Sequence, residues 1–274
     1  MSATGQEPVA VLGIGAMGHA MATSALRAGL PTIVWNRTPA ATRDLAGLGA
    51  DVAETAAEAA RRAAIVVTMV TDTDAVVSIA RDQGMLAALA PGAIWVQMST
   101  IGVAGIDRVA AMVAAERPDV TLLDAPVSGS REPAEQGQLT IFASGPEEAR
   151  PRVAALFDAL GQRTIWVGEV GAGSRLKLVN NTLVAFAAEA VATAVALAGR
   201  MGIETGTVIE AVSGGPLVSP CQAAKLDRIA TGEFSAQFAL SLALKDVRLA
   251  LQAAGDDRFA ALACLADEWQ QAAD

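Results

Sequence analysis

Few side chains in this sequence are able to move a proton, and lysine stands out among them. The 274 residues include one histidine, His19, and no tyrosine. The chain therefore lacks a histidine cluster for a catalytic metal, a Ser-His-Asp or Cys-His triad, and a Tyr-Lys proton-donor pair. Lysine, aspartate, glutamate and cysteine remain for proton transfer. Lys177 and Asn181 are four residues apart, a spacing that places both side chains on one face of a helix.

A second group of residues has the spacing of a dinucleotide-binding turn. An apolar run, Val9 to Leu12, leads into the sequence GIGAMG, and a helical pattern follows to Leu30. In such a turn the first glycine allows a tight bend, the second lets the backbone approach a pyrophosphate, and the third lets the helix pack closely on the sheet. The helix N-terminus then faces the phosphates. The predicted cofactor contacts are Gly13, Ile14, Gly15, Ala16, Met17 and Gly18.

The end of the next apolar run bears on which nicotinamide cofactor is used. Enzymes that use NAD place an acidic residue near this point to bind the ribose 2′-hydroxyl, whereas this chain has Asn36, Arg37 and Thr38. An arginine between two polar side chains offers a positive charge and hydrogen-bond donors to a 2′-phosphate. We therefore expect NADP(H) to be preferred, with NAD(H) also possible. A solvated loop arginine is the alternative interpretation.

Short apolar runs recur through the first 168 residues and predict buried strands. Continuous rather than alternating apolarity is what a parallel sheet covered on both faces requires, and helical patterns lie between most of the runs. The runs are Val9–Ile14, Pro31–Trp35, Ala64–Val70, Ala93–Met98, Val120–Leu123, Leu139–Ala143 and Thr164–Val167. We therefore predict a doubly wound α/β domain over residues 1–168.

After the glycine cluster at 168–173, the apolar runs that predict strands give way to helical patterns. Residues 174–201 contain no proline and one glycine, which predicts a single long helix. Four further helical patterns follow, at Glu204–Ser213, Ser219–Ala230, Leu240–Ala254 and Arg258–Ala273. We predict an all-α domain over residues 169–274, and its apolar surface predicts a homodimer or homotetramer.

The net charge and the N-terminal residues argue against a nucleic-acid-binding, secreted or membrane protein. Twenty basic and 29 acidic residues give a net charge of −9, which repels nucleic acid and anionic lipid. The first eight residues, MSATGQEP, lack the pattern of a signal peptide, so we expect a cytoplasmic protein. The stretch Leu178–Ala198 is long enough for a membrane span, but Asn180, Asn181 and Glu189 favour a helix buried between domains or against a second subunit.

The cysteines and the histidine are not expected to take part in catalysis. Two cysteines, Cys221 and Cys264, cannot form a disulfide framework and are expected to be small core residues. His19 directly follows the glycine turn and has no partner for a proton relay, so we expect a surface or phosphate-side contact. No metal site is predicted.

Four motifs in order resemble the β-hydroxyacid dehydrogenase family, which includes 3-hydroxyisobutyrate dehydrogenases and the glyoxylate and succinic semialdehyde reductases. They are GIGAMG at 13–18, DAPVSGS at 124–130, GAG at 171–173 followed by Lys177 and Asn181, and Lys245-Asp246. The resemblance covers nearly the whole chain. It implies an N-terminal Rossmann-type domain, a long interdomain helix and an all-α C-terminal domain.

The resemblance assigns the catalytic roles to Lys177 and Asn181. It implies that Lys177 protonates the carbonyl oxygen as hydride arrives from the nicotinamide, and removes that proton in the oxidative direction. Asn181 is expected to hold the lysine and the substrate oxygen. A lysine active at neutral pH needs a pKa lowered to about 7–8 by burial or nearby positive charge. A lysine on the helix surface is the alternative.

Substrate contacts are expected in two loops of the first domain. Ser128, Gly129 and Ser130 follow a strand, and their hydroxyls and amides can hold a carboxylate. A plain turn is the alternative. By resemblance, Thr100 faces nicotinamide and substrate, although it could instead cap the following helix.

The second domain is expected to complete the pocket on closure. By resemblance, Lys245 lies near the cofactor, Asp246 lies at the rim of the substrate site, and Phe238 packs over the substrate. A solvated helical charge pair and a core phenylalanine are the alternatives.

The run SGSREPAEQGQLT at 128–140 looks like the glyoxylate and succinic semialdehyde reductases, because hydroxyisobutyrate enzymes more typically have glycine at the position of Ser130. The sequence LSLAL at 240–244 departs from that subgroup, and Asp274 ends the chain earlier than in many members. We expect hydride transfer between NADP(H) and a short aldehyde acid, a small carboxylate. An NAD(P)-dependent 3-hydroxyisobutyrate dehydrogenase is the alternative, and a non-catalytic dinucleotide sensor or scaffold is the alternative from another class.

Overall fold

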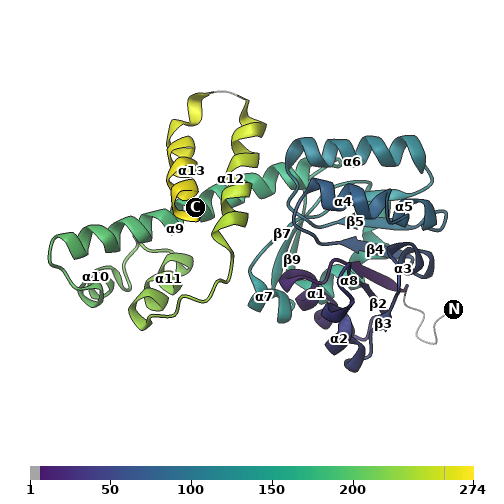
Figure 1. Ribbon diagram of the computed structural model, residues 1–274, viewed down its shortest axis with the longest axis horizontal. Helices are drawn as coiled ribbons and strands as arrows, with labels where there is room; N and C mark the ends of the chain where they lie inside the picture. Colours follow the sequence, from purple (N-terminus) through teal and green to yellow (C-terminus); the bar gives the residue numbers. More distant parts are fainter. Residues whose placement is uncertain (1–6, 256) are drawn as a thin grey trace. The chain divides into compact units, whose positions relative to one another are not determined.

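Six short strands form the central sheet in the order β3-β2-β1-β4-β5-β6 (Figure 1). Every neighbouring pair in this sheet is parallel. The strands are β1 (Val9–Leu12), β2 (Thr32–Trp35), β3 (Asp51–Val52), β4 (Ile65–Thr68), β5 (Ile94–Gln97) and β6 (Thr121–Asp124). Chain order reverses between β1 and β4, and in sheets of this order a dinucleotide binds at that reversal. The computed structural model describes residues 7–255 and 257–274.

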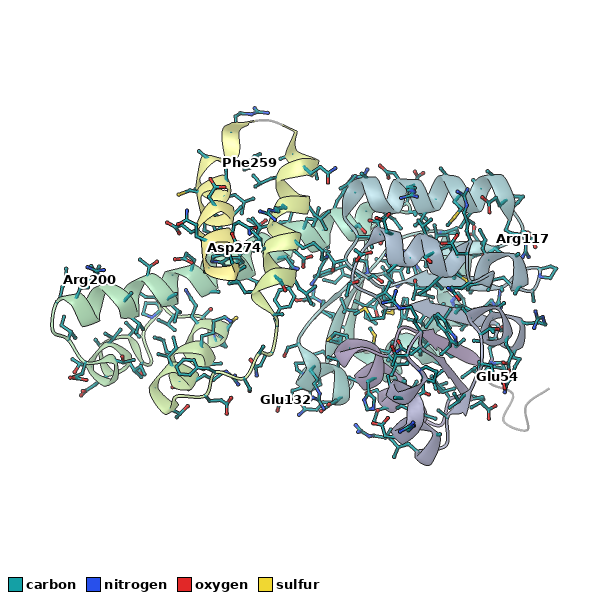
Figure 2. The ribbon with its side chains drawn as sticks, in the orientation of Figure 1. Glu54, Arg117, Glu132, Arg200, Phe259 and Asp274 are labelled. Atoms are coloured by element: carbon teal, nitrogen blue, oxygen red, sulfur yellow. The ribbon has the colours of Figure 1, made fainter. Side chains whose placement is uncertain are left out.

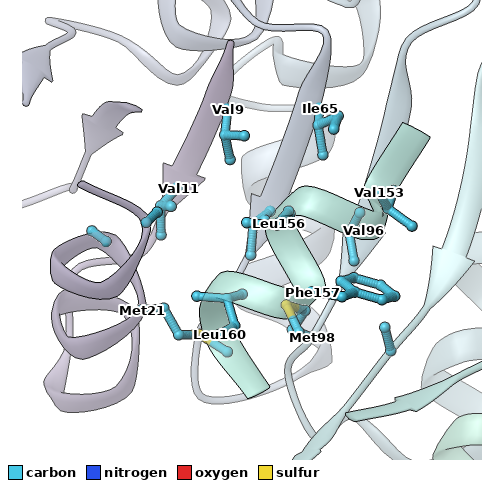
Figure 3. Close-up of a cluster of buried hydrophobic side chains, with 14 of the residues drawn as sticks. Val9, Val11, Met21, Ile65, Val96, Met98, Val153, Leu156, Phe157 and Leu160 are labelled. Atoms are coloured by element: carbon cyan, nitrogen blue, oxygen red, sulfur yellow. The ribbon is translucent and has the colours of Figure 1, made fainter. Parts of the chain in front are cut away.

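Helices cover both faces of this sheet, as the continuous apolar runs predict. Along β1, Val9 and Val11 join one cluster of buried side chains, whereas Ala10 and Leu12 join another, because successive residues of a strand point to opposite faces. Figure 3 shows the first cluster, in which Met21 and Leu156 come from two different helices. The helices of this unit are α1 (Ala16–Arg27), α2 (Arg43–Gly47), α3 (Ala56–Arg62), α4 (Thr73–Ala80), α5 (Met85–Ala88), α6 (Gly102–Glu116), α7 (Arg131–Glu135) and α8 (Arg150–Leu160), with 3₁₀ turns at Pro39–Thr42 and Glu147–Ala149.

A second, three-stranded sheet contains the last two predicted runs. Its order is β7 (Val127–Ser128), β8 (Leu139–Ala143) and β9 (Gly161–Trp166). The pair β7 and β8 is antiparallel, and β8 and β9 are parallel. A bridge between Asp124 and Ser144 joins the end of β6 to the end of β8. The two sheets therefore meet where the DAPVSGS motif begins.

The chain divides after Lys177 into two compact units, and the described residues of the second form helices joined by loops, with no strand. The division falls inside one continuous helix, α9 (Ala172–Arg200), which confirms the predicted long helix. The others are α10 (Thr205–Val212), α11 (Pro220–Thr231), α12 (Leu240–Ala254), a 3₁₀ turn at Asp257–Phe259, and α13 (Ala260–Ala273). Ala185 of α9, Leu244 and Val247 of α12, and Leu265 and Trp269 of α13 form the core of this unit.

The cysteine prediction is wrong, because both thiols are exposed. In α13 the buried face is set by Leu262, Leu265, Ala266 and Trp269, at the three- and four-residue spacing of one helix face. Cys264 falls outside that face. Position on the helix therefore outweighs the usual preference of cysteine for the core.

Helix α9 leaves much of its apolar surface uncovered within the chain. It is long and apolar enough to cross a membrane by length and composition, and 17% of its most apolar window is buried. Leu183 and Leu197 are 69% and 51% exposed. Glu189 nevertheless has partners, since Trp269 Nε1 donates to it at 2.9 Å and Thr193 Oγ1 at 2.7 Å. The bond from Trp269 ties α13 to α9.

Candidate active site

The carboxyl ends of the parallel strands bring the predicted residues of the first unit to one edge of the sheet. The glycine turn follows β1, Asn36 follows β2, and Thr100 comes shortly after β5. Asp124 is the last residue of β6. Loops at the carboxyl ends of parallel strands form the ligand site in folds of this class. This edge is therefore where a cofactor and substrate are expected.

The three glycines of the turn have different structural requirements. An added Cβ at Gly13 would lie 2.4 Å from the Met69 carbonyl oxygen, and one at Gly18 would lie 1.9 Å from the Gly13 carbonyl oxygen. An added Cβ at Gly15 would meet no heavy atom within 4 Å. Gly13 and Gly18 thus permit close packing, whereas Gly15 borders open space at the N-terminus of α1.

The start of α1 suits an anion. Gly15 is its N-cap residue and has no side chain to accept hydrogen bonds from the first turn. The first N–H groups of a helix have no acceptor within the helix, and its dipole favours negative charge there. The open space beside Gly15 and these donors together fit the pyrophosphate of a dinucleotide.

Asn36 connects the glycine turn to the loop after β2. Its Oδ1 accepts from the Ile14 N–H at 2.9 Å, and its Nδ2 donates to the Thr38 carbonyl at 3.0 Å. Arg37 and Thr38 are exposed. The side chain of Asn36 is thereby committed to shaping the loop, and Arg37 is the residue there that carries charge.

The expectation that His19 has no partner is wrong, because it pairs with Asp44. Its Nε2 lies 2.6 Å from Asp44 Oδ2, and this hydrogen bond holds the pKa of Asp44 below its usual value. The pair joins α1 to α2 on the surface.

The loop after β5 is fixed by its own side chains. Gln97 Nε2 donates to the Ser99 carbonyl at 2.9 Å, and the Ser99 N–H donates to Gln97 Oε1 at 2.7 Å. Ser99 Oγ accepts from the Val70 N–H at 2.9 Å, which links this loop to the one after β4. Thr100 follows directly and is half-buried. The N-cap of the next helix is Ile101, so the structure does not show Thr100 as that cap.

The SGS turn lies between β7 and α7 and pairs with β8. Ser128 pairs with Thr140 of β8, and Gly129 has a φ of +131°, with an added Cβ only 2.7 Å from Leu139 Cδ2. Ser130 precedes α7, whose exposed Glu132 is labelled in Figure 2.

Two side chains of α1 hold the end of α7. Ser24 Oγ donates to the Ala134 carbonyl at 2.8 Å, and Arg27 Nη1 donates to the Glu135 carbonyl at 2.7 Å. The helix that begins at the glycine turn therefore also supports the loop with two serine hydroxyls.

Lys177 follows the anchored start of α9. The Ser174 N–H donates to Asp124 Oδ2 at 2.7 Å, and Ser174 Oγ donates to Asp124 Oδ1 at 2.8 Å. Burial raises the pKa of the Asp124 carboxyl, against the lowering effect of these bonds. Lys177 lies three residues after Ser174 and is 9% exposed. This is not the exposure of an ordinary surface lysine.

Sequence inspection did not assign roles to Asp124, Ser144 or Ser174, although Asp124 belongs to a quoted motif. The available signal was an acidic residue directly after the apolar pair Leu122 and Leu123. A carboxylate at the end of a buried strand requires partners, and these come from residues distant in the sequence.

Asn181, Lys245 and Asp246 form one network in the second unit. Asn181 Nδ2 donates to Asp246 Oδ2 at 2.6 Å, and Lys245 Nζ donates to Asp246 Oδ1 at 2.7 Å. Asn180 Nδ2 donates to Asn181 Oδ1 at 3.1 Å. Asp246 is 4% exposed, so it is not part of a solvated charge pair. Its carboxylate orients the amide of Asn181.

Two further predictions concern Phe238 and metals. Phe238 is 45% exposed and is not a core residue. Among the residues that the structure describes, no group of three or more histidine, cysteine or acidic side chains could hold a metal ion.

Two family models match this chain. Residues 8–168 match the NAD binding domain of 6-phosphogluconate dehydrogenase, and residues 171–273 match the model described as NAD-binding of NADP-dependent 3-hydroxyisobutyrate dehydrogenase.

Individual proteins match along most of their length. Glyoxylate/succinic semialdehyde reductase 1 of Arabidopsis thaliana is 31% identical over 91% of this chain and 86% of its own. The NAD-dependent L-serine dehydrogenase of Pseudomonas aeruginosa is 33% identical over 90% of this chain and 85% of its own. A crystal structure of 3-hydroxyisobutyrate dehydrogenase from Salmonella typhimurium matches with a TM-score of 0.87 and 29% identity, covering 98% of this chain and 94% of that one.

Proposed function

The chain belongs to the β-hydroxyacid dehydrogenase family of NAD(P)-dependent oxidoreductases, and from this premise we propose that it reduces a short aldehyde acid of the glyoxylate or succinic semialdehyde type with NADPH. The family models and the names of most relatives make it an NAD(P)-dependent dehydrogenase or reductase, which disfavours a non-catalytic sensor or scaffold. The observation that carries the catalytic assignment is the buried Lys177, one turn beyond the point where α9 is held to the end of β6.

Lys177 is the proton donor in this proposal. Bound NADPH supplies the hydride that reduces the carbonyl carbon. The ammonium of Lys177 donates a proton to the carbonyl oxygen, which completes the hydroxyl group, and the neutral amine then recovers a proton from solvent. In the oxidative direction the amine accepts the hydroxyl proton. Asn181, whose amide is oriented by Asp246, holds the reacting oxygen and the lysine.

The cofactor is assigned to the glycine turn and the loop after β2. The first N–H groups of α1 hold the pyrophosphate beside Gly15, and Arg37 holds the 2′-phosphate. Thr100, in the loop after β5, is assigned to the nicotinamide, and Lys245 is assigned as a further cofactor contact. The similarity to a relative named as NAD-dependent makes NAD(H) the alternative. A kcat/KM for NADPH at least about tenfold above that for NADH supports Arg37 in this role, and equal values would reject the preference.

The substrate carboxylate is assigned to the SGS turn. Ser128 and Ser130 offer hydroxyl donors, and Gly129 adopts a backbone conformation that favours glycine. Asp246 and Phe238 are assigned as further substrate contacts. The similarity to glyoxylate/succinic semialdehyde reductase 1 supports a short aldehyde acid. The match to a hydroxyisobutyrate dehydrogenase structure favours methylmalonate semialdehyde and 3-hydroxyisobutyrate as the second candidate pair.

One steady-state panel separates these possibilities. Glyoxylate, succinic semialdehyde, methylmalonate semialdehyde and their hydroxyacids are each assayed with NADPH/NADP⁺ and with NADH/NAD⁺. The proposal expects the highest kcat/KM for glyoxylate or succinic semialdehyde with NADPH. The highest value for the hydroxyisobutyrate pair would select the second candidate. NADPH binding without turnover of any member would contradict the proposed substrate class.

A second copy of this chain is proposed to cover the apolar face of α9. Val179, Leu183 and Leu197 are more than half exposed, and the polar bonds made by Glu189 argue against a bilayer as their environment. Light scattering is expected to give at least twice the monomer mass of 27.8 kDa, and Leu183→Asp is expected to lower it. A monomer at micromolar concentration, or binding to lipid vesicles, would contradict this assembly.

A further inference from the structure

We propose that Asp124 and Ser144 cap the start of α9 from outside the helix and thereby set the position of Lys177. The α9 clamp consists of Asp124, Ser144, Gly173 and Ser174. In this inference Asp124 is a positioning residue for proton transfer. The inference rests on the proposed role of Lys177 as acid and base.

The start of α9 lacks a cap of its own. The residue before the helix is Gly171, which has a φ of +94° and no side chain. Helices usually begin with serine, threonine, aspartate or asparagine, whose oxygen accepts from the first turn. Here Ser144 Oγ accepts from the Gly173 N–H at 3.0 Å, and Asp124 Oδ2 accepts from the Ser174 N–H at 2.7 Å. The capping groups therefore come from the ends of β6 and β8.

The clamp fixes rotation as well as position. Ser174 makes two bonds to one carboxylate, through its N–H and its hydroxyl. Gly173 lies so close to the strand ends that an added Cβ would be 2.3 Å from the Phe142 carbonyl oxygen and 2.8 Å from that of Asp124. The first turn of α9 can therefore neither rotate nor move away without breaking bonds to buried groups.

The clamp is built on rigid backbone. The Asp124 N–H donates to the Ser144 carbonyl at 3.0 Å, and the Ser144 N–H donates to the Asp124 carbonyl at 2.8 Å. Asp124 and Ser144 are 0% exposed and Ser174 is 3% exposed. Water therefore does not compete for these bonds, and both capping groups move only with the sheets.

Lys177 is the residue most affected by this arrangement. Ser174 and Lys177 are three residues apart in a continuous helix, so they share a face. A side-chain tip about 6 Å from the helix axis moves by about 1 Å when the helix turns by about 10°. A displacement of about 1 Å at a reacting group costs on the order of 100-fold in rate. Small movements at the clamp are thus expected to lower the rate of proton transfer.

A purely structural role makes a different prediction. If the clamp only stabilises the fold, its loss lowers the unfolding temperature and leaves kcat unchanged at a temperature where the variant is folded. If it positions Lys177, kcat falls while NADPH binding stays intact, because the glycine turn belongs to another loop. Comparing the change in kcat with the change in unfolding temperature therefore separates a positioning role from a purely structural one.

The test compares Asp124→Asn and Ser174→Ala with Thr32→Val as a matched control. Thr32 is also buried and its hydroxyl makes one bond, to the Leu30 carbonyl at 2.8 Å, at the start of β2 and away from the site. We expect kcat with glyoxylate or succinic semialdehyde, whichever is the better substrate, to fall by about tenfold or more in Asp124→Asn and severalfold in Ser174→Ala. The Kd for NADPH should stay within about twofold in both, and Thr32→Val should lower stability alone. Where Lys177 is essential for activity, unchanged kcat in folded Ser174→Ala would overturn the inference, even if Asp124→Asn fails to fold.

A second measurement needs no turnover. The labelling rate of Lys177 by an amine-reactive reagent, read by peptide mass spectrometry, should change by about threefold or more in Ser174→Ala relative to wild type. Lys225 on α11 serves as the internal reference. If Lys177 proves dispensable for activity but its labelling responds to the clamp, the proposed function fails and the positioning stands. If Lys177 is essential but neither kcat nor labelling responds, only the positioning fails.

Discussion

Gly15 and Gly18 lie three residues apart in the same turn, and the structure predicts opposite effects for the same substitution. In Gly15→Ala the new methyl group enters open space, with no heavy atom within 4 Å. The backbone at Gly15, with φ −84° and ψ −169°, is accessible to alanine. The loss of a favourable N-cap residue and the lower entropy of the unfolded chain oppose each other, so the free energy of unfolding should change by less than about 1 kcal/mol.

The cost of Gly15→Ala appears in cofactor binding instead. In the proposed site, the methyl group would block the approach of the pyrophosphate to the N-terminus of α1. The loss of one hydrogen bond to a charged group costs about 1.5–3 kcal/mol, which raises the Kd for NADPH by about 10- to 150-fold. In Gly18→Ala the methyl group would lie 1.9 Å from the Gly13 carbonyl oxygen, so the backbone must shift. Overpacking of this kind lowers the free energy of unfolding by about 1–3 kcal/mol or more.

Two measurements on each variant test this contrast. Fluorescence titration gives the Kd for NADPH, and urea denaturation gives the free energy of unfolding. Gly206→Ala on α10, where an added Cβ also meets nothing within 4 Å, is the matched control: it should leave the Kd for NADPH unchanged and raise the free energy of unfolding by no more than about 1 kcal/mol. A Gly15→Ala protein that binds NADPH within about twofold of wild type would refute the placement of the pyrophosphate, and a Gly18→Ala protein of normal stability would refute the packing.

Three further predictions concern separate parts of the first unit. Arg37→Ala should raise the KM for NADPH by about tenfold and leave that for NADH unchanged, with Arg61→Ala as control; an equal effect on both cofactors would contradict a contact with the 2′-phosphate. Burial raises the pKa of Asp124 above 3.8, so the folded state binds this proton more tightly than the unfolded state and loses stability as pH rises above that value. Asp124→Asn should remove this part of the pH dependence. If the free energy of unfolding of the variant and of the wild type changed in parallel from about pH 4 to pH 7, the raised pKa of Asp124 would be contradicted. Thr68→Val leaves the buried Trp95 Nε1–H without its 3.0 Å acceptor and should cost about 1–3 kcal/mol in urea unfolding, whereas a change near zero would show that the indole finds another partner.

The first unit shows which strands a sequence can predict. Strands β1, β2, β4 and β5 are buried at all four positions, so most of their residues are apolar on both faces, and the polar ones, Thr32, Thr68 and Gln97, make hydrogen bonds. Strands β3 and β7 have two residues each, too few for any periodicity. Their pairing depends on neighbours supplied by the rest of the fold. The same holds for the separation of β8 and β9 into a second sheet.

In the second unit, the ends of two predicted helices coincide with local start and stop signals. Helix α12 ends at Ala254 before Gly255, which adopts the left-handed conformation at the C-cap, and α11 begins with proline after the capping residue Ser219. Such signals are local. The exposure of Cys264 was predictable from the spacing of Leu262, Leu265 and Trp269, and residue type alone gave the wrong answer.

The motifs of the candidate site could be predicted from the sequence, but the hydrogen bonds that join them could not. The glycine turn, the SGS turn and Lys177 each have a local pattern. The α9 clamp has none, because Asp124 and Ser174 are fifty residues apart and meet only when β6, β8 and α9 are in place. The link from Asn181 to Asp246 likewise spans 65 residues. Hydrogen bonds between distant residues follow from topology, which local patterns do not specify.

The most direct test of the account is kcat for Lys177→Ala. Loss of a general acid and base costs about 100- to 10,000-fold, so kcat should fall well below a tenth of the wild-type value. The Kd for NADPH and the unfolding temperature should stay close to wild type, and Lys225→Ala should retain full activity. A Lys177→Ala enzyme that keeps more than about a tenth of wild-type kcat would contradict the proposal that this side chain transfers the proton.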